Sequence, residues 1–308
     1  MNRFINLLII VLFALLISCS STSYKYINIQ VLNPSDTMLP VNTSKLHIVD
    51  PCGQKESKNI CIKGLNQSVF DTTLKQNIEQ SPSLKNIAVA IQKEEELKEE
   101  MKNKLSGLHV LLTSNYSVKV DTSDFENRAY SYYGNYILTY HAKVELSDLK
   151  TRKPYDTFQY ADSFSWPRQN SQGFLIKRKL TDLLTETEYI AAMRYANHIA
   201  SYWTTDQRMY YYSSSHLMDI ANTRFEENDL DGAITLWKEV YAKENTKLKA
   251  FAAYNLGLAY EMLDDLNECE SWLLKSKQIK RYAPVYNYLS IIKKRKTQHA
   301  HLDQMFHD

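Results

Sequence analysis

The sequence predicts two successive domains: an α+β domain with a mainly antiparallel sheet and helices on one face, then an all-α domain of helical hairpins. Two patterns support this prediction. Hydrophobic residues recur at every second position between residues 108 and 166, which is the period of a strand, and with helical period from residue 175 to residue 292. With 308 residues, 44% of them hydrophobic, the chain has the length of about two domains and enough apolar surface for their cores.

Short elements are predicted before the long alternating region. Two strands stop at Asn33-Pro34 and at Asp50-Pro51, and they are marked by alternating hydrophobic residues: Ile27, Ile29, Val31, Leu46 and Ile48. Residues 67–80 and 83–106 are predicted helices, and Gly107 ends the second one.

Three long strands follow. The residues that share one face are Leu108, Val110, Leu112, Tyr116, Val118 and Val120 in the first strand, Tyr136, Leu138, Tyr140, Ala142, Val144 and Leu146 in the second, and Phe158, Tyr160, Phe164 and Trp166 in the third. The middle strand is polar on its other side, which is typical of an antiparallel sheet with one face in water. Residues 148–154 are the predicted hairpin loop, and the α+β domain is predicted over residues 25–170.

The remainder of the chain is predicted to be helical. Residues 175–205 are predicted to form one connecting helix, because an apolar stripe runs from Leu180 to Trp203. Thr204-Thr205-Asp206 is predicted to end this helix. Residues 206–295 are predicted to form the helical hairpins, and residues 296–308 a flexible tail.

A repeat is visible within the helical region. Its first copy contains Ala221, Leu230, Ala233 and Trp237, and its second, 36 residues later, contains Gly257, Leu266, Cys269 and Leu273. This spacing resembles the tetratricopeptide signature, in which small residues let two helices approach and large residues fill the gaps between hairpins. The predicted packing residues are Ala221, Ala233, Trp237, Gly257, Tyr260 and Cys269. An unrelated helical bundle with coinciding alanines is the alternative.

The chain begins like a secretory signal. Arg3 precedes an apolar stretch from Leu7 to Ile17, which is too short to span a bilayer, since a spanning helix needs about twenty residues. Leu16-Ile17-Ser18-Cys19 resembles the bacterial lipobox. The resemblance implies a signal peptide over residues 1–18, a covalent lipid on Cys19, and a lipidated tether over residues 19–24. Ser20, which is not acidic, resembles an outer-membrane sorting signal, so we expect the protein to face the periplasm there.

Composition excludes several classes of function. With 37 Lys and Arg against 35 Asp and Glu, the chain has no basic excess for nucleic acid. Seven glycines leave little material for a phosphate-binding loop, and the GxSxG and HExxH motifs are absent. Cys52 and Cys61 either form a disulfide or remain two thiols, and with Cys269 they do not make a zinc site.

The remaining polar clusters have ordinary interpretations. His299, His301 and His307 lack a carboxylate partner in the sequence, and His141 and Glu145 share the wet face of a predicted strand. Basic residues 293–296 and those around Arg281 can touch anionic lipid, but a solvated helix face is the simpler interpretation. We therefore expect no enzyme activity, no metal and no cofactor beyond the lipid on Cys19.

Motifs along most of the chain resemble one family. They are the lipobox, residues 195–212, and Asp231-Gly232-Ala233-x-x-Leu236-Trp237 before Asn255-Leu256. Together they are similar to an uncharacterised lipoprotein family of Gram-negative bacteria of the Bacteroidota type, which carries C-terminal tetratricopeptide repeats. The resemblance implies no activity, because that family has none assigned.

These observations predict a membrane-anchored, non-enzymatic scaffold that docks an envelope protein or peptide in the groove of its repeats. The expected groove residues are Met218, Asn222, Phe225, Tyr254, Leu258, Glu261 and Met262. The alternative is a module that binds glycan or peptidoglycan with the tyrosines of the long strands: Tyr132, Tyr133, Tyr136 and Tyr140. An enzyme with an unfamiliar site is a third hypothesis.

Overall fold

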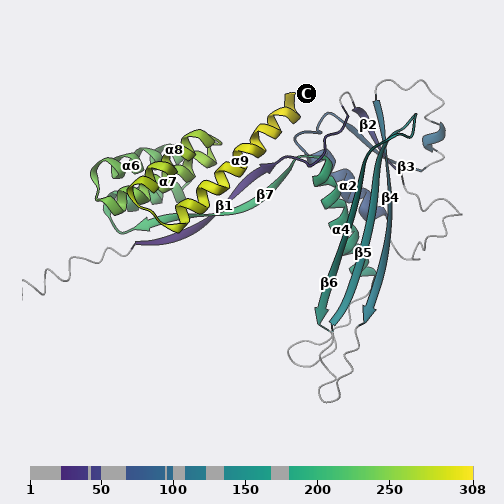
Figure 1. The fold of residues 1–308 in the computed structure, drawn as a ribbon, viewed down its shortest axis with the longest axis horizontal. Coiled ribbons are helices and arrows are strands. Elements are labelled where there is room, and N and C mark those ends of the chain that lie inside the picture. Colours follow the sequence, from purple (N-terminus) through teal and green to yellow (C-terminus); the bar gives the residue numbers. More distant parts are fainter. Residues whose placement is uncertain are drawn as a thin grey trace, which may run out of the picture. The chain divides into compact units, whose positions relative to one another are not determined.

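The structure is a computed structural model that describes residues 22–40, 43–49, 67–93, 96–99, 108–122, 135–167 and 180–307. It has a strand-rich N-terminal region and a helical C-terminal region, as predicted (Figure 1). The chain divides into two compact units. The helical unit comprises the described parts of Met1–Leu32 and Trp203–His301, and the sheet unit those of Asn33–Tyr202 and Leu302–Asp308. The predicted signal peptide, Cys19, Cys52 and Cys61 lie outside the described residues.

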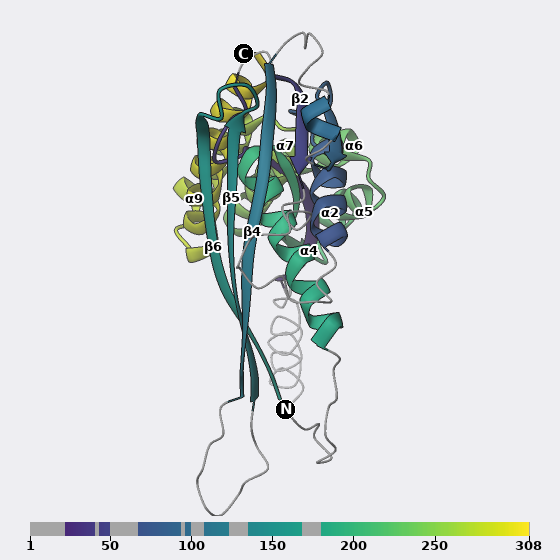
Figure 2. The ribbon, with the colours of Figure 1, turned by 90° about the vertical axis from the view of Figure 1, so that its right-hand side faces the viewer.

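The sheet unit is built on five strands in the order β3-β2-β4-β5-β6. Figure 2 shows β4, β5 and β6 side by side, with β2 beyond β4. Their bounds are Thr43–Val49 for β2, Ala88–Gln92 for β3, Leu108–Thr122 for β4, Asn135–Asp148 for β5 and Pro154–Pro167 for β6. β4, β5 and β6 are the three predicted strands and pair antiparallel. β2, however, is parallel to both β3 and β4, which the sequence prediction missed. A helix between β2 and β3 allows the two strands to run in the same direction.

Two helices, α2 (Gln67–Gln80) and α4 (Leu180–Ile199), cover one face of this sheet (Figures 1 and 2). Their buried residues Phe70, Leu74 and Tyr195 pack with Val144 and Leu146 of β5. His141 and Lys143 are exposed on the opposite face. The prediction of one covered and one wet face therefore holds for this stretch of β5, whereas β2 is buried on both faces, at Leu46 and Ile48 on one side and at His47 and Val49 on the other.

The helix predicted over residues 83–106 is wrong at its start, because residues 88–92 form the edge strand β3. Val89 is buried and lies opposite Leu46 in the parallel pairing with β2. Pairing with β2 and burial of a β-branched side chain outweigh the local helical pattern. Residues 96–99 are helical, and those beyond them lie outside the described part.

The helical unit contains one pair of strands and five helices among its described residues. β1 (Thr22–Asn33) pairs with β7 (Tyr202–Ser213), and the two run in opposite directions (Figure 1). We call this pair the β1–β7 ribbon. The helices are α5 (His216–Glu226), α6 (Leu230–Lys243), α7 (Thr246–Met262), α8 (Leu266–Ile279) and α9 (Ala283–His307). No helix in the described residues is long and apolar enough to cross a membrane.

Three sequence predictions are corrected here. The connecting helix, predicted over residues 175–205, ends at Ile199, and Tyr202–Ser213 is a strand. Aromatic and Thr residues dominate that segment, and they favour a strand once a partner strand is available. β1 belongs with the helical unit and does not join the five-stranded sheet. Finally, the tail predicted as flexible over residues 296–308 is helical through His307, within α9.

The two hairpins α5–α6 and α7–α8 repeat the same turn. Asn228 and Asp264, which precede the second helix of each hairpin, adopt left-handed backbone angles with φ of 64° and 59°. The next residues cap those helices: Asp229 accepts from the Gly232 amide at 3.0 Å, and Asp265 accepts from the Glu268 amide at 2.9 Å. The hairpins are thus matched in local geometry as well as in spacing.

Gly257 lies at a close approach between α7 and α8. A methyl group there would lie 2.8 Å from the side chain of Leu273 and 3.4 Å from the carbonyl oxygen of Cys269. We expect Gly257→Ala to lower the free energy of unfolding by about 1–3 kcal/mol, because the buried Leu273 has little room to move. Urea denaturation measures this. Ala242→Gly, an exposed change of similar size near the end of α6, should cost no more than about 1 kcal/mol.

Candidate functional site

The predicted groove residues do not face an open groove. Among them, Met262 alone is partly exposed, and the other six have side chains that are 3% exposed or less: Met218, Asn222, Phe225, Tyr254, Leu258 and Glu261. The expectation that these side chains contact an external partner is therefore wrong. The predicted packing residues Ala221, Ala233, Trp237, Gly257 and Cys269 are buried, and Tyr260 is partly buried.

The chain's own strand β7 fills the predicted groove. The side chain of Asn255 on α7 binds the main chain of Tyr211 twice: its Oδ1 accepts from the amide at 2.8 Å and its Nδ2 donates to the carbonyl oxygen at 2.8 Å. Asn222 on α5 donates to the same carbonyl oxygen at 3.2 Å and accepts from the indole of Trp237 at 3.1 Å. Two helices thus hold an extended segment by its backbone.

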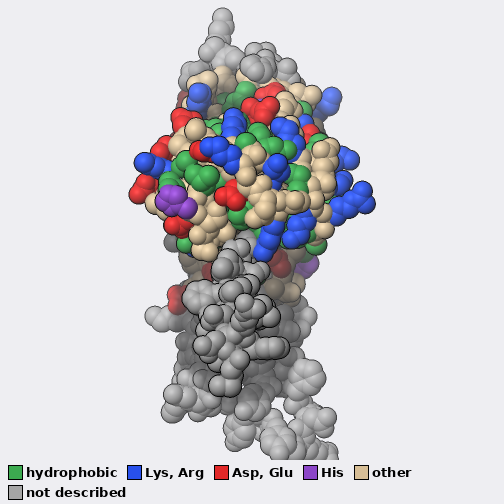
Figure 3. Space-filling model, turned by 90° about the vertical axis from the view of Figure 1, so that its left-hand side faces the viewer, with side chains coloured by type: hydrophobic (Ala, Val, Ile, Leu, Met, Phe, Trp, Pro, Cys, Tyr) green, Lys and Arg blue, Asp and Glu red, His purple; other side chains and the backbone are tan. Residues whose placement is uncertain are grey.

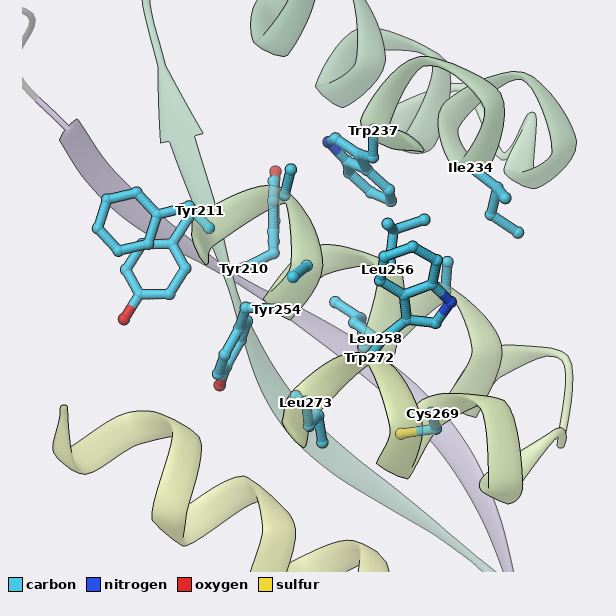
Figure 4. Packing of buried hydrophobic residues seen from close by; sticks show 14 of the residues in the cluster. Tyr210, Tyr211, Ile234, Trp237, Tyr254, Leu256, Leu258, Cys269, Trp272 and Leu273 are labelled. Carbon is cyan, nitrogen blue, oxygen red and sulfur yellow. The ribbon is translucent and has the colours of Figure 1, made fainter. Parts of the chain in front are cut away.

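Aromatic side chains extend this contact. The ring of Tyr211 stacks on Phe251 with centroids 3.9 Å apart and meets Tyr254 edge-on at 5.1 Å (Figure 4). Tyr210 packs edge-on against Phe225 at 5.2 Å. Burial raises the pKa of Tyr211 to about 12, so it stays a neutral phenol at physiological pH. The ribbon is therefore part of the core of the helical unit.

A buried charge cluster fixes β7 to α7 and α9. Arg208 of β7 donates from Nε to Glu261 Oε2 at 2.9 Å and from Nη2 to Oε1 at 2.9 Å. On α9, Arg295 donates to Glu261 Oε1 at 2.8 Å, and the Tyr288 hydroxyl donates to Oε2 at 2.5 Å. Burial by itself would lower the pKa of Arg208, but its hydrogen bonds to Glu261 raise it further than burial lowers it. Arg208 is therefore charged in the buried cluster.

The histidines predicted to lie in the tail are on a helix. His299 Nε2 lies 3.0 Å from Asp264 Oδ2, and Asp264 also accepts from Arg295 at 3.2 Å. In the part of the chain that the structure describes, no group of three or more His, Cys, Asp or Glu side chains is placed to hold a metal ion. His299 instead helps to join α9 to the turn before α8.

Glu226 at the end of α5 joins both strands of the ribbon. Lys25 of β1 donates to its carboxylate at 2.7 Å and Tyr210 of β7 at 2.5 Å, and these hydrogen bonds hold the pKa of Glu226 below its usual 4.5. A carboxyl whose pKa is lowered by folding adds stability above its unfolded pKa, and this contribution is lost as the pH falls through the folded pKa.

We therefore expect Glu226→Gln to lose stability at neutral pH and to match the wild type at low pH. The loss at pH 7 should be below about 1 kcal/mol, since 44% of the Glu226 side chain is exposed to solvent. Urea unfolding from pH 7 down to pH values below 4.5 measures the gap. A difference in unfolding free energy between variant and wild type that stayed constant across this pH range would contradict the stabilising role of the Glu226 carboxylate.

The sheet unit has its own polar cluster. His198 near the end of α4 lies between two carboxylates, with Nδ1 3.2 Å from Asp36 and Nε2 3.0 Å from Asp156, and its ring packs on Phe158 at 4.6 Å. Because both ring nitrogens are engaged, His198 ties the segment after β1 to α4 and β6. The candidate pair His141 and Glu145 lies on the exposed strand face, where Glu145 meets Lys143 at 3.4 Å.

The four tyrosines of the glycan hypothesis are not tested by the structure. Tyr132 and Tyr133 lie outside the described residues, and the side chains of Tyr136 and Tyr140 in β5 lie outside the described part as well. Tyr160 of β6 is half-buried and lies under Arg194 of α4.

The β1–β7 ribbon presents an exposed face that the sequence reading missed. Its side chains are Tyr24, Tyr26, Asn28 and Gln30 of β1 with Trp203, Thr205 and Gln207 of β7. We call this set the outer strip. All seven are exposed, none is charged, and Tyr24, Tyr26 and Trp203 are each 57% exposed. The two strands are linked across the strip by Gln30 Nε2, which donates to Thr205 Oγ1 at 3.0 Å. Strand alternation would have found the strip, had residues 202–213 been recognised as a strand.

Comparison with known proteins gives one sequence match. Residues 219–298, from within α5 to within α9, match the model of a family described as a domain of unknown function (DUF6340). No curated protein matches the chain.

Solved structures resemble the chain weakly. A Helicobacter pylori homolog of the neuraminyllactose-binding hemagglutinin is 14% identical, with a TM-score of 0.29 over 54% of this chain and 82% of that one. A minor lipoprotein from Acinetobacter baumannii is 8% identical, with a TM-score of 0.28 over 52% and 98%. Uncharacterized lipoprotein B from Nitrosomonas europaea is 11% identical, with a TM-score of 0.29 over 53% and 84%. At these TM-scores the similarities establish neither the fold nor the function of this chain.

Proposed function

We propose that the protein is a non-enzymatic lipoprotein of the cell envelope, anchored through Cys19 at the periplasmic side of the outer membrane. In this proposal the helical unit is a scaffold of the tetratricopeptide type that has taken its own β1–β7 ribbon into the groove. A protein partner then docks on the outer strip. The repeated turns at Asn228 and Asp264, 36 residues apart, support the repeat assignment.

The outer strip carries this proposal. Large aromatic side chains set among neutral amide and hydroxyl groups are the composition of protein-binding surfaces, because aromatic rings bury much area at low entropic cost. A chain with 23% charged residues nevertheless leaves this face without a charge. The ribbon is also held firmly from behind by Asn255 and the buried charge cluster, so little ordering is needed on binding.

Photo-crosslinking in intact cells tests the docking surface. We expect a crosslinking residue at position 203 or 26 to capture a discrete protein, whereas one at the exposed position Asn267 on α8 should not. In the position-203 variant, Tyr26→Ala should reduce the yield at least tenfold, which corresponds to about 1.4 kcal/mol for loss of an aromatic anchor. Equal yields from position 267 and position 203 would contradict the proposal.

The anchor is tested separately by fractionation. The wild type should appear in the membrane fraction. Cys19→Ala should lose its lipid, because alanine has no thiol to which the lipid can be attached. A Cys19→Ala protein that still carried a covalent lipid would contradict the assignment of Cys19 as its attachment site.

A glycan ligand is the second candidate, and the same strip favours it. Aromatic rings stack on sugar rings, while amides and hydroxyls bind sugar hydroxyls, and this surface offers both without a charge. Isolated peptidoglycan sacculi should then retain the wild type and release Trp203→Ala, with Trp272→Phe as a control whose ring is buried. Retention of wild type and Trp203→Ala alike would count against this candidate.

A further inference from the structure

Six basic side chains gather at one end of the helical unit, which we call the basic end. They are Lys247 and Lys249 at the start of α7, Lys275 and Lys277 near the end of α8, and Lys280 and Arg281 before α9. Ser276 holds these segments together: its hydroxyl donates to the carbonyl oxygen of Ala250 at 2.7 Å and lies 2.8 Å from the hydroxyl of Tyr282. Figure 3 views the unit from one side, and Lys and Arg side chains crowd the right-hand half of that face.

These charges are not neutralised within the described part of the chain. None of the six forms an ion pair with a described carboxylate, in contrast to Lys25, Lys243 and Lys296 of the same unit. The nearest acidic residues along the chain are engaged elsewhere, since Glu244 accepts from Ser215 at 3.2 Å and Glu270 binds Lys296 at 2.7 Å. The basic end therefore carries a net positive charge that an anionic partner can neutralise.

Aromatic rings lie directly beneath four of the lysines. The ammonium groups are 3.8 Å from the ring centroid of Trp272 for Lys275, 4.8 Å from Tyr286 for Lys277, 5.1 Å from Phe251 for Lys280 and 5.5 Å from Tyr241 for Lys249. Tyr286 is itself 43% exposed. Lysines set among amphipathic aromatic rings are the combination that membrane–water interfaces favour.

The start of β1 lies at the same end of the unit. Lys25 is over the ring of Tyr212 at 4.6 Å, and the adjacent Tyr211 stacks on Phe251, the ring beneath Lys280. β1 begins at Thr22, three residues after Cys19, and three residues of any conformation span at most about 10 Å. A lipid on Cys19 would therefore hold the basic end within reach of the bilayer surface.

We propose that the basic end lies against the anionic phospholipid headgroups of the membrane that holds the Cys19 lipid. The inference rests on the lipid anchor of the proposed function, and it adds an orientation: the basic end faces the bilayer. The acyl chains supply attachment, whereas the lysines decide which side of the helical unit meets the headgroups. Each lysine near an anionic surface contributes about 1 kcal/mol, or about fivefold in occupancy of that orientation.

Lysine labelling on vesicles tests the orientation. The lipidated full-length protein is reconstituted into vesicles of phosphatidylcholine, or of phosphatidylcholine with an equal part of phosphatidylglycerol, and each lysine's acetylation rate is measured by mass spectrometry. We expect Lys247, Lys275, Lys277 and Lys280 to react at least tenfold more slowly on the anionic vesicles. The difference should shrink in high salt, since the screening length falls from about 10 Å at 0.1 M to about 3 Å at 1 M. Lys85 and Lys150, exposed in the sheet unit, serve as internal references.

Charge-matched variants complete the test. Replacing Lys275, Lys277 and Lys280 by Gln should abolish the protection of Lys247, while replacing Lys85, Lys150 and Lys153 by Gln should leave it unchanged. Equal labelling rates on both kinds of vesicle would overturn the inference while leaving the anchor intact. Failure of the protein to float with either vesicle would overturn the anchor and the inference together. Protection in intact cells but not on anionic vesicles would assign the basic end to an acidic protein and overturn the membrane assignment.

Discussion

Replacing Glu261 by Gln is expected to destabilise the helical unit by about 3–5 kcal/mol, because it leaves buried arginines without their carboxylate. The side chains of Arg208 and Arg295 are 5% and 11% exposed, and both donate to Glu261, whose own side chain is fully buried. Gln keeps the shape of the side chain but removes its charge. Asp206 and Asp264 remain as partly exposed partners of the two arginines, so the loss should fall short of complete unfolding.

Urea denaturation followed by tryptophan fluorescence measures this effect, since Trp237 and Trp272 are buried in the helical unit. The matched control is Glu239→Gln, which removes a carboxylate paired with the exposed Lys243 and should cost less than about 1 kcal/mol. The double variant with Arg208→Met should lose less stability than the sum of the two single variants, because the two side chains contact each other. A loss for Glu261→Gln no larger than that of the control would show that the cluster does not hold β7 in place.

Asn255→Ala is expected to lower the stability of the helical unit by about 2–4 kcal/mol and to loosen β7. The change removes both hydrogen bonds between the Asn255 side chain and the main chain of Tyr211. The carbonyl oxygen of Tyr211 keeps its bond from Asn222, but its amide is left buried without an acceptor, which costs about 1–3 kcal/mol by itself. The cavity left by the amide group adds to this loss.

Asn287→Ala on α9 is the matched control for this change. Its side chain is exposed, so the stability should stay within about 0.5 kcal/mol of the wild type. Hydrogen exchange supplies a local readout, because the Tyr211 amide should exchange much faster in Asn255→Ala and at the wild-type rate in Asn287→Ala. Unchanged exchange at Tyr211 in Asn255→Ala would contradict the role of Asn255 as a clamp.

Periodicity alone predicted much of the fold. The alternation in β4, β5 and β6 and the helical period of α5 to α8 are long patterns, and long patterns specify an element strongly. Elements that depend on distant partners were missed. β3 forms because Val89 lies opposite Leu46 across some forty residues of chain, and no local pattern encodes that pairing.

In the candidate site, too, local patterns predict some features, whereas features that depend on distant residues are missed. Spacing predicted that Asn222, Tyr254 and Glu261 line one groove, and all three do contact the same segment, β7. Asn222 donates to the carbonyl oxygen of Tyr211, Tyr254 meets the ring of Tyr211, and Glu261 accepts from Arg208. The sequence does not predict that β7 fills this groove. The apolar stripe that ends at Trp203 predicts a helix through residues 202 and 203, which are the first residues of β7. Thr204, Thr205 and Asp206 predict a helix stop, whereas in the structure partly buried and exposed side chains alternate through them, as in a strand. Because the helical pattern masks the strand β7, the sequence predicts an open groove where the structure has a filled one.

The measurement that tests this account most directly is native-state hydrogen exchange at the amide of Tyr211 in the wild-type protein. If β7 is a fixed part of the helical core, this amide exchanges only when α7 opens, at the rate of buried α7 amides such as those of Leu256 and Leu258. If the Tyr211 amide exchanges as fast as that of an unfolded chain while the α7 amides stay protected, the groove is open to other ligands. That result would contradict the central claim that the protein fills its own repeat groove.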